Sequence, residues 1–97
     1  MADFVASVVS YAAYKTLPIS EHRTLGSLAL TPDQLFFVAR CTIWCAAPGV
    51  PSRDSGYSGY ASKRARCNVP AMNTPGFEVA FACPPGSRMN PATKCRF

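Results

Sequence analysis

The sequence predicts a mainly α-helical fold, in which three helices of about residues 2–15, 31–45 and 74–82 are joined by long irregular loops. Apolar side chains near the start of the chain recur at spacings of three and four, the period of a helix. A strong helix-start pattern opens at Thr31. The stretches between the helices are rich in proline, glycine and serine, which interrupt regular structure.

The first predicted helix covers residues 2–15. Phe4, Val8 and Tyr11 follow one another at spacings of four and three, which favours a helix even though β-branched valines are poor helix formers. Leu17-Pro18 ends it, because the residue before a proline is pushed out of the helical region.

The second predicted helix starts at Thr31-Pro32-Asp33-Gln34, where Thr31 is a good cap and Pro32 suits the first helical position. We expect it to run to about Cys45. Its apolar residues, which cover most of its circumference, are Leu35, Phe36, Phe37, Val38, Ile43 and Trp44. Such a helix should be buried on more than one side, which a chain of 97 residues can hardly provide. The pattern therefore indicates a larger parent protein.

Residues 46–72 are predicted to be a long irregular connection, because prolines and glycines are scattered among serines and basic residues there. A third, short helix is expected over 74–82. Asn73-Thr74-Pro75 would open it, and Cys83-Pro84-Pro85 would end it.

The charge of the chain excludes some classes of partner. Ten basic and five acidic residues give a formal net charge of +5, but the basic residues are scattered. The densest cluster, Lys63-Arg64-Ala65-Arg66, is shorter than a typical nucleic-acid patch, so we predict no nucleic-acid partner. No apolar stretch approaches the ~20 residues of a membrane helix, so we also predict no membrane span in this segment.

Five cysteines without a C-x-x-C spacing fit disulfides in an oxidising compartment. Five is an odd number, so at least one cysteine must pair outside the chain or stay free. An acid, Asp3, stands where a signal peptide has its basic region, and a signal peptide is therefore not predicted. An exported protein without a signal is explained if further residues lie upstream of Met1.

The residues alone supply no catalytic metal site. The chain has one histidine and no H-E-x-x-H motif, and its glutamates, Glu21 and Glu78, adjoin no histidine pair. A structural metal site from Cys41, Cys45 and Cys67 is conceivable, but the spacing is loose. We therefore predict no bound metal on this chain, and the residues by themselves leave the function open.

Four stretches, read together in their order and spacing, carry a resemblance that covers nearly the whole chain. They are Ala2-Asp3 with Ser10-Tyr11-Ala12-Ala13-Tyr14, Leu35-Phe36-Phe37 through Ile43-Trp44-Cys45, Phe77-Glu78-Val79-Ala80-Phe81-Ala82-Cys83, and Met89-Asn90-Pro91 followed by Lys94-Cys95-Arg96. In these stretches the chain resembles the C-terminal portion of the neprilysin and endothelin-converting-enzyme family of zinc metallopeptidases.

The resemblance implies roles for three residues. Asp3 matches an aspartate that supports a zinc-binding histidine without itself binding the zinc. Arg66 matches an arginine that hydrogen-bonds the backbone of the peptide substrate. Tyr60 stands where the family places a histidine that stabilises the oxyanion of the intermediate, and a tyrosine offers no cationic donor near neutral pH. The resemblance places the zinc ligands upstream of Met1, so zinc is expected in the complete parent enzyme and not on this chain.

The resemblance also implies that Cys45, Cys83 and Cys95 form disulfides with cysteines far upstream. Cys41 and Cys67 have no counterpart in the family pattern, and a bridge between them is a hypothesis that would account for all five cysteines.

We therefore expect residues 1–97 to be a partial C-terminal peptidase domain of a neprilysin-like zinc metalloendopeptidase, which cleaves oligopeptides outside the cell. The parent is either secreted or the ectodomain of a membrane-anchored protein. Its partners are peptide substrates and the missing N-terminal part of the same polypeptide, and the chain alone is predicted to be non-catalytic. The alternative is a standalone secreted, disulfide-stabilised binding protein, derived from a truncated peptidase gene, that uses residues 46–72 to bind a partner.

Overall fold

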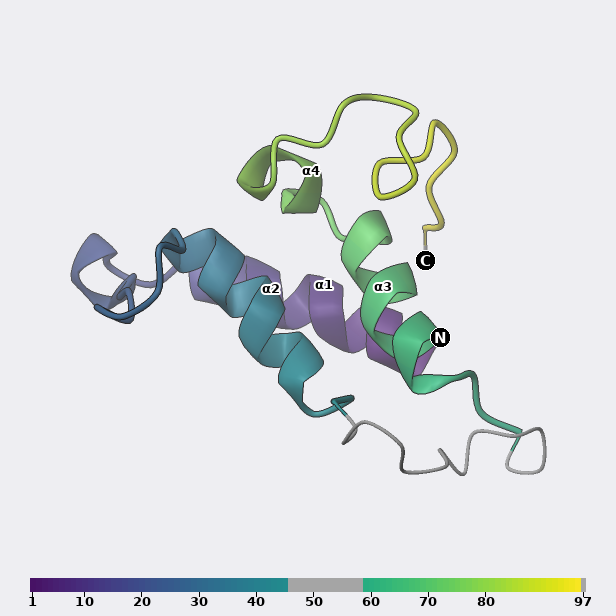
Figure 1. The fold of residues 1–97 in the computed structure, drawn as a ribbon, viewed down its shortest axis with the longest axis horizontal. Coiled ribbons are helices and arrows are strands. Elements are labelled where there is room, and N and C mark those ends of the chain that lie inside the picture. Colours follow the sequence, from purple (N-terminus) through teal and green to yellow (C-terminus); the bar gives the residue numbers. More distant parts are fainter. Residues whose placement is uncertain (46–58, 97) are drawn as a thin grey trace.

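Helices make up the regular structure of the described residues (Figure 1). The computed structural model describes residues 1–45 and 59–96. It contains α1 (Ala2–Lys15), a short 3-10 helix η1 (Ile19–Glu21), α2 (Pro32–Thr42), α3 (Lys63–Asn73) and α4 (Phe77–Ala80). The described residues contain no strand, and the predicted mainly α class is confirmed.

α1 has the bounds that the sequence predicted. α2 begins as predicted, because a capping box forms at its start. The Gln34 backbone N–H donates to the Thr31 hydroxyl over 3.2 Å, and the Thr31 N–H donates to Oε1 of Gln34 over 3.0 Å. α2 ends at Thr42, three residues before the predicted end at 45, because the N–H groups of Trp44 and Cys45 bond three residues back instead of four.

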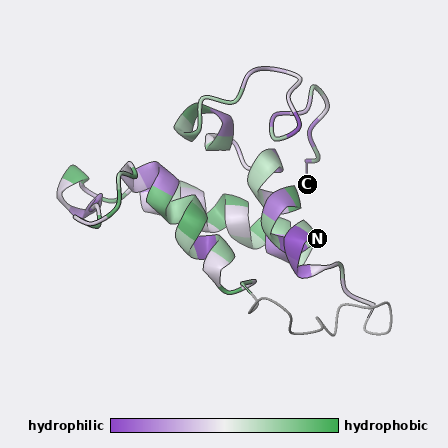
Figure 2. Ribbon diagram, in the orientation of Figure 1, coloured by the Kyte–Doolittle hydropathy of each residue, from purple (hydrophilic) through white to green (hydrophobic). Residues whose placement is uncertain are grey.

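The predicted irregular connection over 46–72 is wrong in its second part, where α3 forms. The Ser62 hydroxyl accepts a hydrogen bond from the Ala65 N–H over 3.2 Å and caps this helix. α3 contains Pro70 and starts with basic residues, which Figure 2 shows as a hydrophilic first turn. Its sequence therefore has no apolar period that would predict a helix. Residues 46–58 lie outside the described part of the chain.

The third predicted helix is shorter than expected, because α4 covers 77–80 and the prediction covered 74–82. Thr74 is the C-terminal cap of α3, and its N–H bonds back to Pro70. Gly76 then adopts a left-handed conformation with φ of 99°. At the other end, Ala82 has φ of 50°, which a continuing helix cannot have.

The core is a group of aromatic rings between α1, α2 and α4. Phe37 of α2 is 2% exposed, and its ring centre lies 4.7 Å from that of Tyr11 and 5.1 Å from that of Phe77. α1 packs along α3, where the buried hydroxyls of Ser7 and Thr74 share a hydrogen bond of 2.8 Å. These contacts fix α1, α2 and α3 relative to one another.

α2 was expected to be buried on more than one side, and in this chain it is not. Phe37 faces the core, whereas Val38 is 40% exposed and Ile43 is 73% exposed. Val38, in this helix, and Ile43, directly after its end, are therefore open to solvent in this chain.

Candidate functional site

Asp3 and Arg66 form a two-point ion pair between the first turn of α1 and the first turn of α3. Nε of Arg66 donates to Oδ2 of Asp3 over 2.7 Å, and Nη2 donates to Oδ1 over 3.2 Å. The side chains are 26% and 29% exposed. The hydrogen bond from Arg66 is the main reason that the pKa of Asp3 is lowered below its usual value, so the carboxylate stays charged.

Two aromatic rings complete the surroundings of Arg66. Its guanidinium carbon lies 4.0 Å from the ring centre of Trp44, just beyond the end of α2, and 5.2 Å from that of Tyr60, just before α3. A guanidinium at these distances is attracted to the face of the ring. The structure therefore brings together Asp3, Tyr60 and Arg66, the three residues that sequence reasoning selected.

Trp44 was expected among the buried residues of α2, but it is half-buried and stacks on Arg66. Its role as a neighbour of Arg66 was missed, since the two residues are far apart in sequence and no motif connects them.

Arg40 is a second residue of this site that the sequence did not reveal. Its Nη2 donates to the backbone carbonyl of Asp3 over 2.6 Å, and its burial lowers its pKa. Arg40 thereby holds the first turn of α1 against α2. Beside the ion pair lies a hollow of about 140 Å³, lined by residues that include Phe4, Ala61 and Val69.

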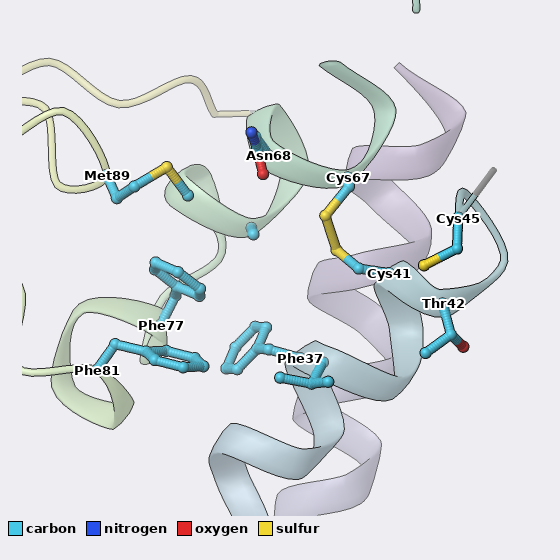
Figure 3. A pocket seen from close by; sticks show the side chains of 11 residues that line it. Phe37, Cys41, Thr42, Cys45, Cys67, Asn68, Phe77, Phe81 and Met89 are labelled. Atoms are coloured by element: carbon cyan, nitrogen blue, oxygen red, sulfur yellow. A yellow bond between two sulfur atoms is a disulfide. The ribbon is translucent and has the colours of Figure 1, made fainter. Parts of the chain in front are cut away.

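A disulfide between Cys41 and Cys67 joins the last turn of α2 to α3, with the two Cα atoms 5.1 Å apart (Figure 3). Cys67 directly follows Arg66. Cys45, Cys83 and Cys95 have free thiols in this chain; Cys45 and Cys95 are exposed and Cys83 is half-buried. Their expected partners upstream therefore remain a prediction.

The disulfide also borders an apolar cavity of about 280 Å³ between α2, α3 and α4. Figure 3 shows Phe37, Phe77, Phe81 and Met89 around it, with Cys45 at its edge. It is lined almost wholly by apolar side chains and lacks the charged groups of the Asp3 and Arg66 pair.

Residues 1–45 and 59–96 bring together no group of three or more histidine, cysteine, aspartate or glutamate side chains that could hold an ion. No step of metal chemistry is therefore assigned to them.

Comparison with known proteins identifies the family. All 97 residues match the family model described as Peptidase family M13. The chain belongs to peptidase family M13.

Curated members of M13 resemble the chain closely in sequence. Neprilysin-1 of Trittame loki is 35% identical over 79% of this chain and 11% of that protein. Endothelin-converting enzyme 1 of Mus musculus is 37% identical over 98% of this chain and 13% of that protein. Neprilysin-2 of Caenorhabditis elegans is 36% identical over 90% of this chain and 12% of that protein. The chain thus spans about one eighth of the length of these M13 proteins.

No solved structure matches the chain significantly. None of the helices in the described ranges is long and apolar enough to cross a membrane. The family resemblance seen in the sequence is confirmed, whereas the roles of Asp3, Tyr60 and Arg66 remain predictions.

Proposed function

We propose that this chain is the C-terminal part of a neprilysin-like zinc metalloendopeptidase that cleaves oligopeptides, and that the chain is inactive without the rest of the polypeptide. Membership of M13 supports the peptidase class. The proteins that it matches are about eight times longer, which supports its being one part of an enzyme.

The observation that carries the proposal is the restraint of Arg66. Its guanidinium is held by two hydrogen bonds from one side and by the ring of Trp44 at 4.0 Å from another. A long arginine side chain normally loses much conformational entropy when it binds a ligand. Because Asp3 and Trp44 have already fixed this one, it can donate to a backbone carbonyl of a bound peptide at a smaller entropic cost.

Asp3 serves this arrangement as an anchor. A carboxylate has about four acceptor positions, so Asp3 can hold Arg66 and still accept a further hydrogen bond. In the proposed parent enzyme that further donor is a zinc-binding histidine from the upstream part. We propose that the zinc ligands also lie in that part, as the family resemblance implies.

Tyr60 is proposed to face the developing oxyanion of the substrate. It is 73% exposed, and its ring lies beside Arg66. Its hydroxyl donates one hydrogen bond but carries no positive charge, so we propose weaker stabilisation of the oxyanion than an imidazolium gives.

We also propose an extracellular location for the parent enzyme. The Cys41 and Cys67 disulfide supports it, because disulfides persist mainly in oxidising compartments. The exposed apolar residues Val38, in α2, and Ile43, directly after its end, support a surface that the rest of the polypeptide covers.

The test compares the 97-residue chain with the polypeptide that includes its upstream part, using cleavage of a short fluorogenic peptide with and without a metal chelator. The longer polypeptide should cleave the peptide and lose activity with the chelator, whereas the 97-residue chain should not cleave it. Arg66→Ala in the longer polypeptide should lower kcat/KM by about 100-fold. Arg64→Ala, the exposed neighbouring arginine, is the matched control and should change it by less than twofold. Equal effects of the two variants would contradict the role of Arg66.

A further inference from the structure

The Cys41 and Cys67 disulfide lies between the two segments that meet at Arg66. Cys67 is the next residue after Arg66 on α3, and Cys41 lies three residues before Trp44 at the end of α2. The disulfide holds the two Cα atoms at 5.1 Å, and the guanidinium of Arg66 lies 4.0 Å from the Trp44 ring centre. One covalent bond thus fixes the spacing of the segments that supply the guanidinium and its stacking surface.

The first turn of α3 is capped by the Ser62 hydroxyl, and the Arg66 N–H donates to the Ser62 carbonyl over 2.9 Å, but one regular helical hydrogen bond is missing after it. Pro70 has no N–H to donate to the carbonyl of Arg66 four residues earlier, so the helix lacks the hydrogen bond that would tie Arg66 to the next turn. The first turn also carries Lys63, Arg64 and Arg66 and no acidic residue. Positive charges at a helix N-terminus are unfavourable, because the partial charge there is also positive.

Two contacts offset this weakness. Asp3 supplies negative charge from α1, and the disulfide fixes the backbone of the adjacent residue. The ion pair and the stacking hold the end of the side chain, but they form only if the backbone of Arg66 stays within reach of Asp3 and Trp44.

We propose that the Cys41 and Cys67 disulfide is a positioning device for Arg66, which holds its guanidinium in the place where it binds the peptide substrate. This inference rests on the proposed function, because it presupposes that Arg66 contacts the substrate. Cys41 and Cys67 act through Arg66 and touch neither substrate nor metal. Loss of the bridge should therefore weaken catalysis only as far as Arg66 contributes to it.

The test is a double-mutant cycle in the polypeptide that includes the upstream part, with kcat and KM measured for one fluorogenic peptide. Removal of the bridge by C41A/C67A should lower kcat/KM by about tenfold while Arg66 is present. In the R66A background the same change should alter kcat/KM by less than twofold, because the group that the bridge positions is already gone. C41V/C67A, which restores some of the lost volume, should behave in the same way.

A matched control loosens α2 at its other end. Nε2 of Gln34 donates to the carbonyl of Ala80 over 2.9 Å, at the N-terminal end of α2, whereas Cys41 lies in its last turn. Gln34→Ala should leave kcat/KM within twofold of the parent value with or without Arg66. A loss like that of the bridge variants would mean that any loosening of α2 matters, and would overturn the proposal.

The other outcomes are also decisive. If the bridge variants lower kcat/KM by the same factor with and without Arg66, or leave it unchanged, the disulfide does not act through Arg66. If neither bridge variant folds, the disulfide is a requirement of the fold, and a positioning role is overturned. If R66A alone leaves kcat/KM unchanged, the proposed role of Arg66 fails. The single variant therefore tests the role of Arg66 separately from that of the disulfide.

Discussion

Asp3 and Arg66 are 63 residues apart in sequence and are joined by two hydrogen bonds, of 2.7 and 3.2 Å, between one carboxylate and one guanidinium. This pair connects the first turns of α1 and α3. It also determines how the candidate site responds to pH, because Asp3 accepts hydrogen bonds in its charged form.

Asp3→Asn should lower the free energy of unfolding by about 1 kcal/mol at pH 7, because a partly exposed charged hydrogen-bonded pair is lost. The folded state lowers the pKa of Asp3 from 3.8, so the stabilisation is present above about pH 4 and disappears as the pH falls through the folded-state pKa. Denaturant unfolding of the parent chain and of the Asp3→Asn variant between pH 7 and pH 2 measures this difference in the free energy of unfolding. Asp33→Asn is the control, since Asp33 also lies in the first turn of a helix and pairs with an exposed lysine, Lys15. An equal or pH-independent loss in the two variants would argue against the Arg66 contact.

Tyr60→His, in the polypeptide with its upstream part, should raise kcat/KM by about tenfold at pH 6, because an imidazolium stabilises an oxyanion better than a neutral hydroxyl does. The gain should shrink by pH 8, where a histidine of ordinary pKa near 6.5 is neutral. Tyr60→Phe keeps the ring beside Arg66 and removes the hydroxyl, so it should lower kcat/KM. The proposed role of Tyr60 fails if the Tyr60→Phe variant and the parent enzyme have the same kcat/KM for peptide cleavage across the pH range.

Removal of the disulfide by C41A/C67A should lower the free energy of unfolding of the 97-residue chain by about 3 kcal/mol, because the bridge closes a loop with a sequence separation of 26 residues. Denaturant unfolding with and without a reductant measures this loss. The unsubstituted chain should lose the same amount on reduction, whereas the variant should not respond to the reductant. A response of the variant would point to other disulfides.

Gly76→Ala should lower the free energy of unfolding by about 2–3 kcal/mol, from backbone strain and from a clash. Gly76 has φ of 99°, and a Cβ atom there would lie 2.7 Å from Cε1 of Tyr11, a ring buried in the core. Gly86→Ala separates the two causes, because Gly86 has φ of 78° and nothing lies within 4 Å of the position that a Cβ atom would take there. That control should lose only about 1 kcal/mol. Thermal unfolding that ranks the two variants equally would exclude the Tyr11 clash.

The sequence was sufficient to predict a helix where local signals determine the structure. α1 has an apolar period that ends before Pro18, and α2 has a capping box at Thr31, so the start of each helix was predicted correctly. α3 was missed because, apart from its Ser62 cap, it is held by groups that are distant in sequence. Asp3, Cys41 and Ser7 all contact it or its cap from other elements, while Pro70 and the basic first turn argue locally against a helix.

The same distinction applies to the candidate site. Asp3, Tyr60 and Arg66 were selected through a family resemblance, which does not depend on knowing their contacts. Arg40 and Trp44 were not selected, since their roles arise only when the end of α2 packs beside Asp3 and Arg66. Packing of that kind has no signature in a single sequence.

The long separations around α1 have a consequence for synthesis of the chain on the ribosome. Phe37, which packs against Tyr11, and Arg40, which donates to the Asp3 carbonyl, are translated soon after α1, but the side-chain partners of Asp3 and Ser7 lie 63 and 67 residues further on. At about 5–20 residues per second, these partners are translated roughly 3–13 seconds after the start of α1. Within this segment the side chains of Asp3 and Ser7 therefore receive their partners later than Tyr11 does. The ion pair of Asp3 and Arg66 can form only after most of the segment has been translated.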